Sequence, residues 1–412
     1  MNADGSPAKP PFISMADAGS FARHTLEARF PQIIGGVMAL RPGAENKKLA
    51  ALRAEAAGGV ISDPFAEGGA ASSCGRDAFH PQEIAVWRGE IARHLGRPWK
   101  EVPFYFAESY LYLRILLACG YHDRSSGYFQ DDPWQGAKLD ELGRFLSAKG
   151  VEGVFAGLAR DGGDSGRDAF TAAVLFMLRA NRIDLSNAAI VEAGRRLILR
   201  GGREDLLVDH TDSLVQSILA SRRVDIVLDN AGAELAADLA FARLYLASDP
   251  ARRLVLHAKK YPTFVSDATI QDVRITAEKL KSSAAAASTG GEIETFLGQG
   301  RLRLADHYFW NGPLHFPAMP EDLRRDLAGS CLTLLKGDAN FRRMTEDRRW
   351  PFSVRLDGLT SWFPGNHAIL RTLKSETASD IPEGLSARMG QEDPGWLTNG
   401  RWGLVRLVSC TG

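Results

Sequence analysis

Val224-Asp-Ile-Val-Leu-Asp-Asn-Ala-Gly-Ala-Glu234 joins a short apolar run, a polar pair and the start of an alanine-rich segment. An apolar, β-branched run of this length is typical of a strand buried inside a sheet. Residues 233–247 are rich in Ala and Leu at helical spacing, so a helix follows the polar pair. In open α/β sheets ligands bind beyond the carboxyl ends of the strands, which makes Asp229 and Asn230 candidate ligand-binding residues.

A second acid occupies a similar position further along the chain. Residues 254–257 form another apolar run, and Asp267 lies on a loop before the helix predicted at residues 270–280. Two acids at neighbouring strand ends can share one hard cation. Asp229 and Asn230 offer oxygen ligands if the amide turns its carbonyl inward, which suits Mg²⁺ or Mn²⁺ better than zinc. Taken alone, the same pair would serve equally well as a helix cap without chemistry.

A third unit of the same kind begins at the apolar run of residues 332–335. It continues as Lys336-Gly-Asp-Ala-Asn-Phe-Arg-Arg343, in which a glycine turn before a helix presents backbone N–H groups to an anion. This is not a Walker A loop, because that pattern of Gly, Lys and Ser or Thr is absent. Two more apolar runs cover residues 368–373 and 404–408, and Lys374 directly after the first can place a point charge on a phosphoryl oxygen.

Composition limits the classes of partner. The 412 residues include 50 Lys and Arg and 50 Asp and Glu, so the formal net charge is zero, which argues against a general nucleic-acid or membrane-surface binder. The four cysteines contain no Cys-x-x-Cys pair and indicate free thiols in a reducing compartment. The sequence shows neither a signal peptide nor an apolar run that could span a membrane, so we expect a cytoplasmic protein.

The chain changes character near residue 221. Before it, helical spacing predicts eight helices, at residues 21–30, 45–57, 81–95, 104–119, 140–148, 168–180, 187–199 and 213–220. After it, strands and helices alternate. We therefore expect an N-terminal helical bundle packed on a three-layer α/β/α Rossmann-like domain. The expected boundaries are a disordered tail at 1–15, a mainly helical domain at 16–221 and the α/β catalytic domain at 222–412.

One predicted helix, residues 104–115, is aromatic and apolar on nearly all sides, yet it carries Glu108 and Arg114. A helix of this kind is buried, and buried charges need partners. Because Glu108 does not share a face with Arg114, a pair between them within the helix is not implied. The favoured interpretation is that these ions tie the helix to a second domain.

Several segments, taken together, resemble the metal-dependent damage-control phosphatases of subfamily III, also named acidic-residue methyltransferases. They are residues 107–112, 229–234, 264–267, 336–342 and 371–374, the last of which has the form Arg-Thr-x-Lys; residues 396–403 also resemble the C-terminal end of the family. The segments follow one another in order along nearly the whole chain. Each is weak alone, and their co-occurrence is a strong signal.

The resemblance implies a role for each matching residue. Asp229, Asn230 and Asp267 match the ligands of one divalent cation, which is Mn²⁺, Mg²⁺, Co²⁺ or Ni²⁺. Lys374 matches a substrate-contacting lysine and Glu234 a ligand-contacting acid, and Asp229, Asp267 and Lys374 are the expected catalytic residues. The expected substrate-binding loop consists of Gly337, Asp338, Ala339, Asn340 and Phe341. Leu113 and Phe341 depart from the Arg and Tyr of relatives, and these departures bear on substrate preference rather than on the metal site.

The implied function is metal-dependent hydrolysis of small phosphorylated metabolites, such as fructose 1-phosphate, in metabolite damage control. The cation would polarise the phosphate, Lys374 and the loop N–H groups would stabilise the charge, and Glu108 and Glu234 would hold sugar hydroxyls. One alternative is an S-adenosylmethionine-dependent carboxyl methyltransferase, although only Gly232 stands where a Gly-rich turn is needed. Another is a sugar-phosphate-binding protein or pathway enzyme that recruited the fold. A haloacid-dehalogenase mechanism fits poorly, because it needs the pattern Asp-x-Asp. Here the pattern would start at Asp229, and its second acid is replaced by Ala231.

Overall fold

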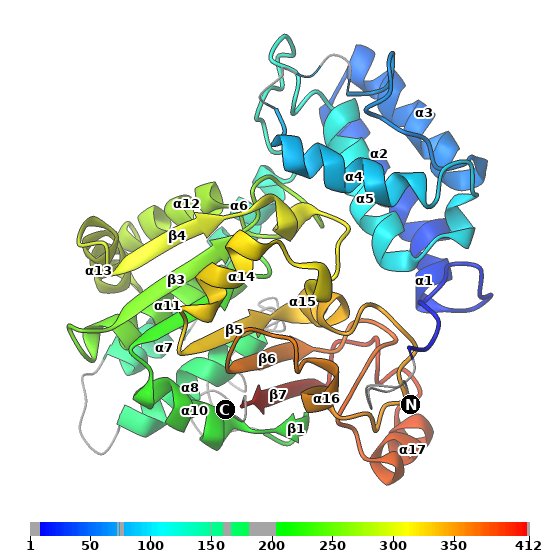
Figure 1. Ribbon diagram of the computed structural model, residues 1–412. Helices are drawn as coiled ribbons and strands as arrows, with labels where there is room; N and C mark the ends of the chain where they lie inside the picture. Colours follow the sequence, from blue (N-terminus) through cyan, green and yellow to red (C-terminus); the bar gives the residue numbers. More distant parts are fainter. Residues whose placement is uncertain are drawn as a thin grey trace.

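The computed structural model describes residues 9–409 except 72–73, 75–77, 149, 160–165 and 181–202. Two bodies lie side by side: a group of helices formed by the first part of the chain, and a twisted sheet with helices on both faces (Figure 1). This mixed α/β architecture confirms the predicted fold class. Across the described ranges, the helices are all too short or too polar to cross a lipid bilayer.

The helical body has its own apolar core. Its elements are α1 (Phe21–His24), the π-helical turn η1 (Thr25–Arg29), α2 (Phe30–Leu40), α3 (Ala44–Gly58), α4 (Pro81–Ala92), η2 (Trp99–Glu101) and α5 (Phe104–Ala118). Every residue of α5 except Arg114 is buried, as the aromatic composition predicts. Arg114 pairs with Glu55 of α3 at 2.8 Å, whereas Glu108 pairs with Arg342 of the sheet body at 2.5 Å. The prediction that these charges tie the helix to a second body is therefore confirmed for Glu108 and wrong for Arg114, which pairs within the helical body.

The sheet has seven strands in the order β1-β7-β6-β5-β2-β3-β4. Their bounds are β1 (Leu206–Asp209), β2 (Arg223–Val227), β3 (Arg253–Ala258), β4 (Leu302–Asp306), β5 (Leu332–Lys336), β6 (His367–Thr372) and β7 (Gly403–Val408). Strands β6, β5, β2, β3 and β4 are parallel, and β7 is antiparallel to β6. The carboxyl ends of β2, β3, β5 and β6 consequently lie at one edge of the sheet.

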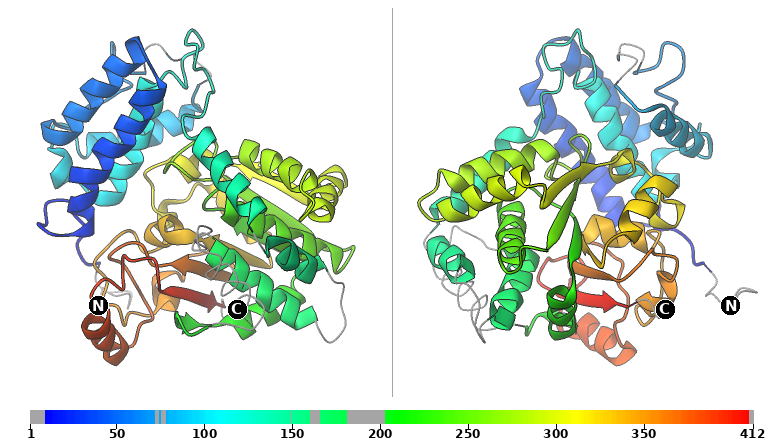
Figure 2. Two further views of the ribbon diagram at one scale, coloured as in Figure 1. Left: turned by 180° about the vertical axis from the view of Figure 1, so that it is seen from behind. Right: turned by 60° about the vertical axis from the view of Figure 1, so that its left-hand side comes forward.

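Helices cover both faces of the sheet, which is visible when the views in Figure 2 are compared. Ile226 of β2 packs in the core beneath α6 (Gln135–Ser147), α7 (Val151–Ala159), α8 (Gly166–Arg179), α10 (Thr211–Ala220), α11 (Ala233–Ala247), α12 (Ile270–Lys281) and α13 (Ala287–Gly298). Val227, the next residue, packs on the other face, with η4 (Tyr308–Asn311), η5 (Phe316–Ala318), α14 (Glu321–Ala328), α15 (Gly337–Met344), α16 (Leu356–Leu359) and α17 (Glu383–Glu392) nearby. Alternation of this kind is what a strand between two helical layers requires.

Some details differ from the expectations. Strands β1 and β4 were not predicted, and the helix predicted at residues 187–199 lies outside the described residues. Residues 9–15 were expected in a disordered tail, but Ile13 and Met15 are buried, and short bridges join Phe12 to Arg348 and Ser14 to Pro103. The domain boundary at residue 221 stays a prediction; β1 and the helices from α6 to α10, which precede it, already pack with the sheet.

Candidate active site

The loops after β2 and β3 are held side by side by their backbones. Ala231 N–H donates to the Ser266 carbonyl at 2.7 Å, and Ala268 N–H donates to the Asp229 carbonyl at 2.8 Å. These bonds create an isolated bridge between Asn230 and Asp267. The paired loops carry the three predicted ligands: Asp229 and Asn230 lie on the first loop and Asp267 on the second. All three side chains line one cleft.

The backbone directly before Asp267 is strained. Phe264 and Val265 both have positive φ, at 48° and 69°. A β-branched residue such as valine rarely adopts this conformation, and each such residue costs on the order of 1–3 kcal/mol. Because strain of this kind persists where the surroundings enforce it, the turn is fixed by the paired loops rather than by local preference.

The acids of this edge are buried close to one another. Burial and the neighbouring carboxylates of Glu234 and Asp267 raise the pKa of Asp229 well above its ordinary value. Burial also raises the pKa of Asp267, against the opposing charge of Lys259, whose Nζ lies 3.2 Å from Asp267 Oδ2. Both side chains of this ion pair are buried. The acids of this edge therefore lie close together in a buried environment that disfavours their charged forms.

This donor set fits a divalent cation. Within the described ranges no three His, Cys, Asp or Glu side chains form a ready-made ligand set, so the candidate set is two carboxylates and the amide of Asn230. Oxygen-only ligands of this kind suit a hard cation such as Mg²⁺ or Mn²⁺. A bound cation would relieve the repulsion that raises the pKa of Asp229.

The amide of Asn230 is oriented opposite to what a metal ligand needs. Its Nδ2 donates to Asp229 Oδ2 at 2.8 Å and to Glu234 Oε2 at 3.0 Å, while its Oδ1 accepts from Ser266 Oγ at 2.5 Å. The NH₂ group thus stands in for positive charge between the two carboxylates. Since a hydroxyl both donates and accepts, exchange of the amide N and O would keep the Ser266 contact and turn an oxygen toward a cation.

The third loop brings α15 close to Asp229. Gly337 has φ of +84°, and a Cβ atom at this position would lie 2.0 Å from Asp229 Oδ2, so only glycine fits. The side chain of Asp338 accepts from Arg371 Nε at 2.8 Å, from the Lys374 N–H at 3.3 Å and from Ser375 Oγ at 3.1 Å. Although burial opposes it, Arg371 holds the pKa of Asp338 below its ordinary value. Asp338 therefore fixes the backbone that carries Lys374.

The remaining predicted residues divide into two groups. Asp338, Ala339, Lys374 and Glu108 line the same cleft as the acids. Gly337 and Glu234 line a much smaller cavity instead, and Asp229, Asp338 and Lys374 line both. The side chains of Asn340 and Phe341 are buried: Asn340 donates to the carbonyls of Lys336 and Leu228, and Phe341 stacks under Arg371. These two side chains support the loop and do not line the cleft.

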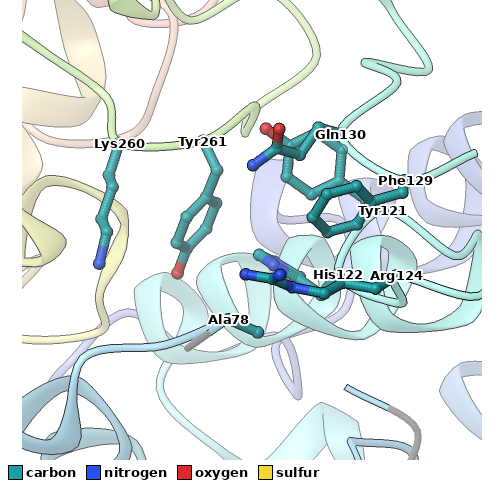
Figure 3. Close-up of a pocket in the computed structure, with 8 residues that line it drawn as sticks. All are labelled: Ala78, Tyr121, His122, Arg124, Phe129, Gln130, Lys260 and Tyr261. Atoms are coloured by element: carbon teal, nitrogen blue, oxygen red, sulfur yellow. The ribbon is translucent and has the colours of Figure 1, made fainter. Parts of the chain in front are cut away.

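The cleft has a volume of about 240 Å³ and lies between the two bodies. Its walls come from the strand-end loops of the sheet and, in the helical body, from Phe21, Arg29 and Glu108. A different pocket, of about 180 Å³, is shown in Figure 3, with Lys260 and Tyr261 facing Tyr121, His122 and their neighbours. It contains none of the predicted site residues, and Lys260 is already paired with Glu83 at 3.1 Å. The chemistry of the acids places the candidate site in the cleft.

Sequence reasoning missed the buried lysines that support the site. Lys336 Nζ lies 2.8 Å from Glu234 Oε1 and 2.5 Å from Asp238 Oδ1. Lys138 of α6 donates to Asp272, to Asp132 and to the carbonyl of Asp267. The sequence does contain a signal for these lysines: Lys336 follows the apolar residues of a strand, and Lys138 lies within an amphipathic helix. A lysine buried at such a position needs acidic partners. The identity of those partners depends on the tertiary fold.

Known proteins resemble the chain along almost its full length. Residues 23–389 match the model of the damage-control phosphatase ARMT1-like domain. The chain is 30% identical to the damage-control phosphatase ARMT1 of Rattus norvegicus, with 97% of this chain and 98% of the relative covered. The same protein from Mus musculus is 29% identical at the same coverage, and that from Danio rerio is 30% identical over 76% of this chain and 74% of the relative.

A solved structure can also be aligned with the chain. The crystal structure of a DUF89 family protein from Pyrococcus horikoshii aligns with a TM-score of 0.44 and 14% identity, covering 72% of this chain and 83% of that one. The family assignment depends on the domain match and the full-length relatives. The chain therefore belongs to the family of ARMT1-like damage-control phosphatases, which is in general metal-dependent.

Proposed function

We propose that this protein hydrolyses small sugar phosphates, such as fructose 1-phosphate, with one divalent cation drawn from Mn²⁺, Mg²⁺, Co²⁺ and Ni²⁺. The carrying observation is that Asp229, Asp267 and Lys374 line one cleft while Gly337 brings α15 against Asp229. Acids for a cation and a lysine for a phosphate are the parts that phosphoryl transfer requires. The small cleft suits a metabolite rather than a nucleic acid, in keeping with the zero net charge.

Asp229, Asn230 and Asp267 would hold the cation, which supplies Lewis-acid polarisation of the phosphate when bound. Lys374, which lines the same cleft, would contribute a positive charge to the phosphate. The first N–H groups of α15 add partial positive charge, since the N-terminus of a helix favours anions. Asp229 or Asp267 orients the attacking water in line with the ester bond, and the sugar leaves as the alcohol while phosphate is released.

Glu108 and Glu234 remain the candidates for binding sugar hydroxyls. Glu108 lines the cleft and accepts from Arg342 Nη1 at 2.5 Å, which leaves its second oxygen available to a hydroxyl. Glu234 has both oxygens engaged, with Lys336 and Asn230. Its contribution to the substrate would therefore be made through Asn230, and Glu108 is the stronger candidate for direct contact.

The methyltransferase alternative receives no support from the turn after β2. A methyl donor would sit over this turn, yet a Cβ atom added at Gly232 would lie 2.7 Å from the carboxylate of Glu141, which covers it. Calorimetric titration with S-adenosylmethionine tests this alternative directly. If the protein is the phosphatase proposed here, S-adenosylmethionine should not bind.

The deciding experiment is a phosphate-release screen over a panel of sugar phosphates with each of the four cations and with chelator. Asp229→Ala should lower the rate by about a hundredfold or more, because it removes a carboxylate from the cation site. Asp306→Ala is the matched control, since Asp306 ends the edge strand β4 and does not line the cleft. Full activity of a folded Asp229→Ala variant would overturn the proposal.

A further inference from the structure

Arg29 lines the cleft from the side of the helical body. It is the last residue of η1, a π-helical turn inserted between α1 and α2. Turns of this kind are uncommon and occur frequently at functional sites, because the extra residue redirects the side chains around it. The insertion therefore singles out the part of the helix that carries Arg29.

The guanidinium of Arg29 is not engaged in a direct polar contact within the described part of the chain. Among the described residues its guanidinium has no hydrogen bond and no ion pair, and its contact is with the ring of Phe21, 5.7 Å away. The other arginine of the cleft, Arg342, is committed to Glu108 at 2.5 Å and to Asp347 at 2.8 Å. Arg29 thus offers an available guanidinium to whatever enters the cleft.

Phe21 is held in place between the two walls. Its N–H donates to Glu376 Oε1 at 3.0 Å, two residues beyond Lys374, and its ring packs edge-to-face on Phe104 at 6.2 Å. The ring on which Arg29 rests is therefore fixed relative to the loop that carries Lys374. Arg29 is exposed to solvent at the cleft and rests against this ring, so its guanidinium can reach an anionic group of a ligand.

Arg29 and Lys374 act on different parts of the cleft. The positive charge of Lys374 is felt by Asp229, whereas that of Arg29 is felt by Glu108 and Tyr112 of α5. Glu108 forms its ion pair with Arg342 and not with Arg29, so the guanidinium of Arg29 is not held by that carboxylate. The cleft consequently has one available cation on the sheet wall and another on the helical wall.

We infer that Arg29 binds a second anionic group of the substrate, so that preferred substrates are sugar phosphates that also carry a carboxylate or a second phosphate. This inference rests on the proposed function and deepens it by naming the substrate class. A guanidinium pairs with carboxylate and phosphate through two parallel hydrogen bonds, which a neutral hydroxyl cannot accept with equal strength. Sugar phosphates without a second anionic group would bind by the Lys374 end alone.

The test compares substrates that differ by one anionic group, so that one member of each pair has a single anionic group and the other is doubly anionic. Glucuronic acid 1-phosphate and glucose 1-phosphate form the carboxylate pair, and fructose 1,6-bisphosphate and fructose 1-phosphate form the phosphate pair. We expect the wild type to favour the doubly anionic member by about tenfold or more in kcat/KM, mainly through KM. Arg29→Ala should reduce that preference by about tenfold, and Arg29→Lys should restore part of it.

Arg23→Ala is the matched control, because Arg23 lies on the same helix, pairs with Glu27 and does not line the cleft. It should keep the preference for doubly anionic substrates. Calorimetric binding of glucuronic acid 1-phosphate to wild type and Arg29→Ala tests the inference even without turnover. Equal affinity of the two proteins, or an unchanged preference in Arg29→Ala, overturns it. If binding depends on Arg29 but no metal-dependent hydrolysis is found, the result refutes the proposed function and leaves this inference standing.

Discussion

The carboxylate of Asp229 lies directly against the Cα atom of Gly337, so that an added methyl group would fall 2.0 Å from Oδ2. These residues follow the carboxyl ends of the neighbouring strands β2 and β5. The contact brings the candidate cation ligand and the start of α15 together without an intervening side chain. It explains why the loop after β5 begins with glycine, whose φ is +84°.

Gly337→Ala should disrupt the site more than the fold. The new methyl group must displace Asp229, and a shift of about 1 Å at a catalytic group costs about a hundredfold in rate. Steady-state kinetics with the best substrate of the screen measure this loss. Gly291→Ala in α13 is the control: its Cβ would meet no atom within 4 Å, and we expect it to stabilise the protein by about 0.5–1 kcal/mol with unchanged kinetics. Similar kinetics for both variants would contradict the packing argument.

Lys138 should be essential for stability. It lies 2.9 Å from both Asp132 and Asp272, and all three side chains are buried. Lys138→Met leaves two buried carboxylates without their cation, which we expect to cost about 3–5 kcal/mol in the free energy of unfolding. Urea denaturation measures it. Lys281→Met, which breaks the exposed pair with Glu294, should leave the midpoint unchanged. A loss equally small for both lysines would show that the buried network contributes little.

The central strands could be predicted because they are buried on both faces and therefore read as continuous apolar runs. The edge strand β4 could not, since Leu302 to Asp306 is short, only Leu302 is buried, and the segment contains no continuous apolar run. Asp229 and Asp267 were accessible to sequence reasoning through their place between a strand and a helix. The pairing of Glu108 with Arg342 was not, because the two residues are 234 positions apart and meet only when the two bodies pack.

Asp238 should make stability depend on pH. Burial first, and then the charge of Glu234, raise the pKa of Asp238 from its ordinary value of 3.8 to about 7, against the opposing charge of Lys336. Because the folded protein holds this proton more tightly than the unfolded chain, the stabilisation is complete below about pH 4 and is lost as pH rises toward 7. The denaturation midpoints of wild type and Asp238→Asn, measured from about pH 4 to about pH 8, test this dependence, because that range covers the pKa values of Asp238 in the unfolded and folded protein. The variant should lose this contribution, and parallel pH profiles for the two proteins would contradict the assignment.

Binding of a cation should be measurable without any substrate. A ligand that binds only the folded state raises the Tm by an amount that grows with its concentration, and the buried acids give the cation its reason to bind. We expect Mn²⁺ to raise the Tm of the chelator-treated wild type by a few degrees and to have little effect on Asp267→Asn, which removes one negative charge with almost no change in shape. The control Asp306→Ala should keep the full shift, because Asp306 does not line the cleft. An equal shift in wild type and Asp267→Asn would place the cation elsewhere on the protein.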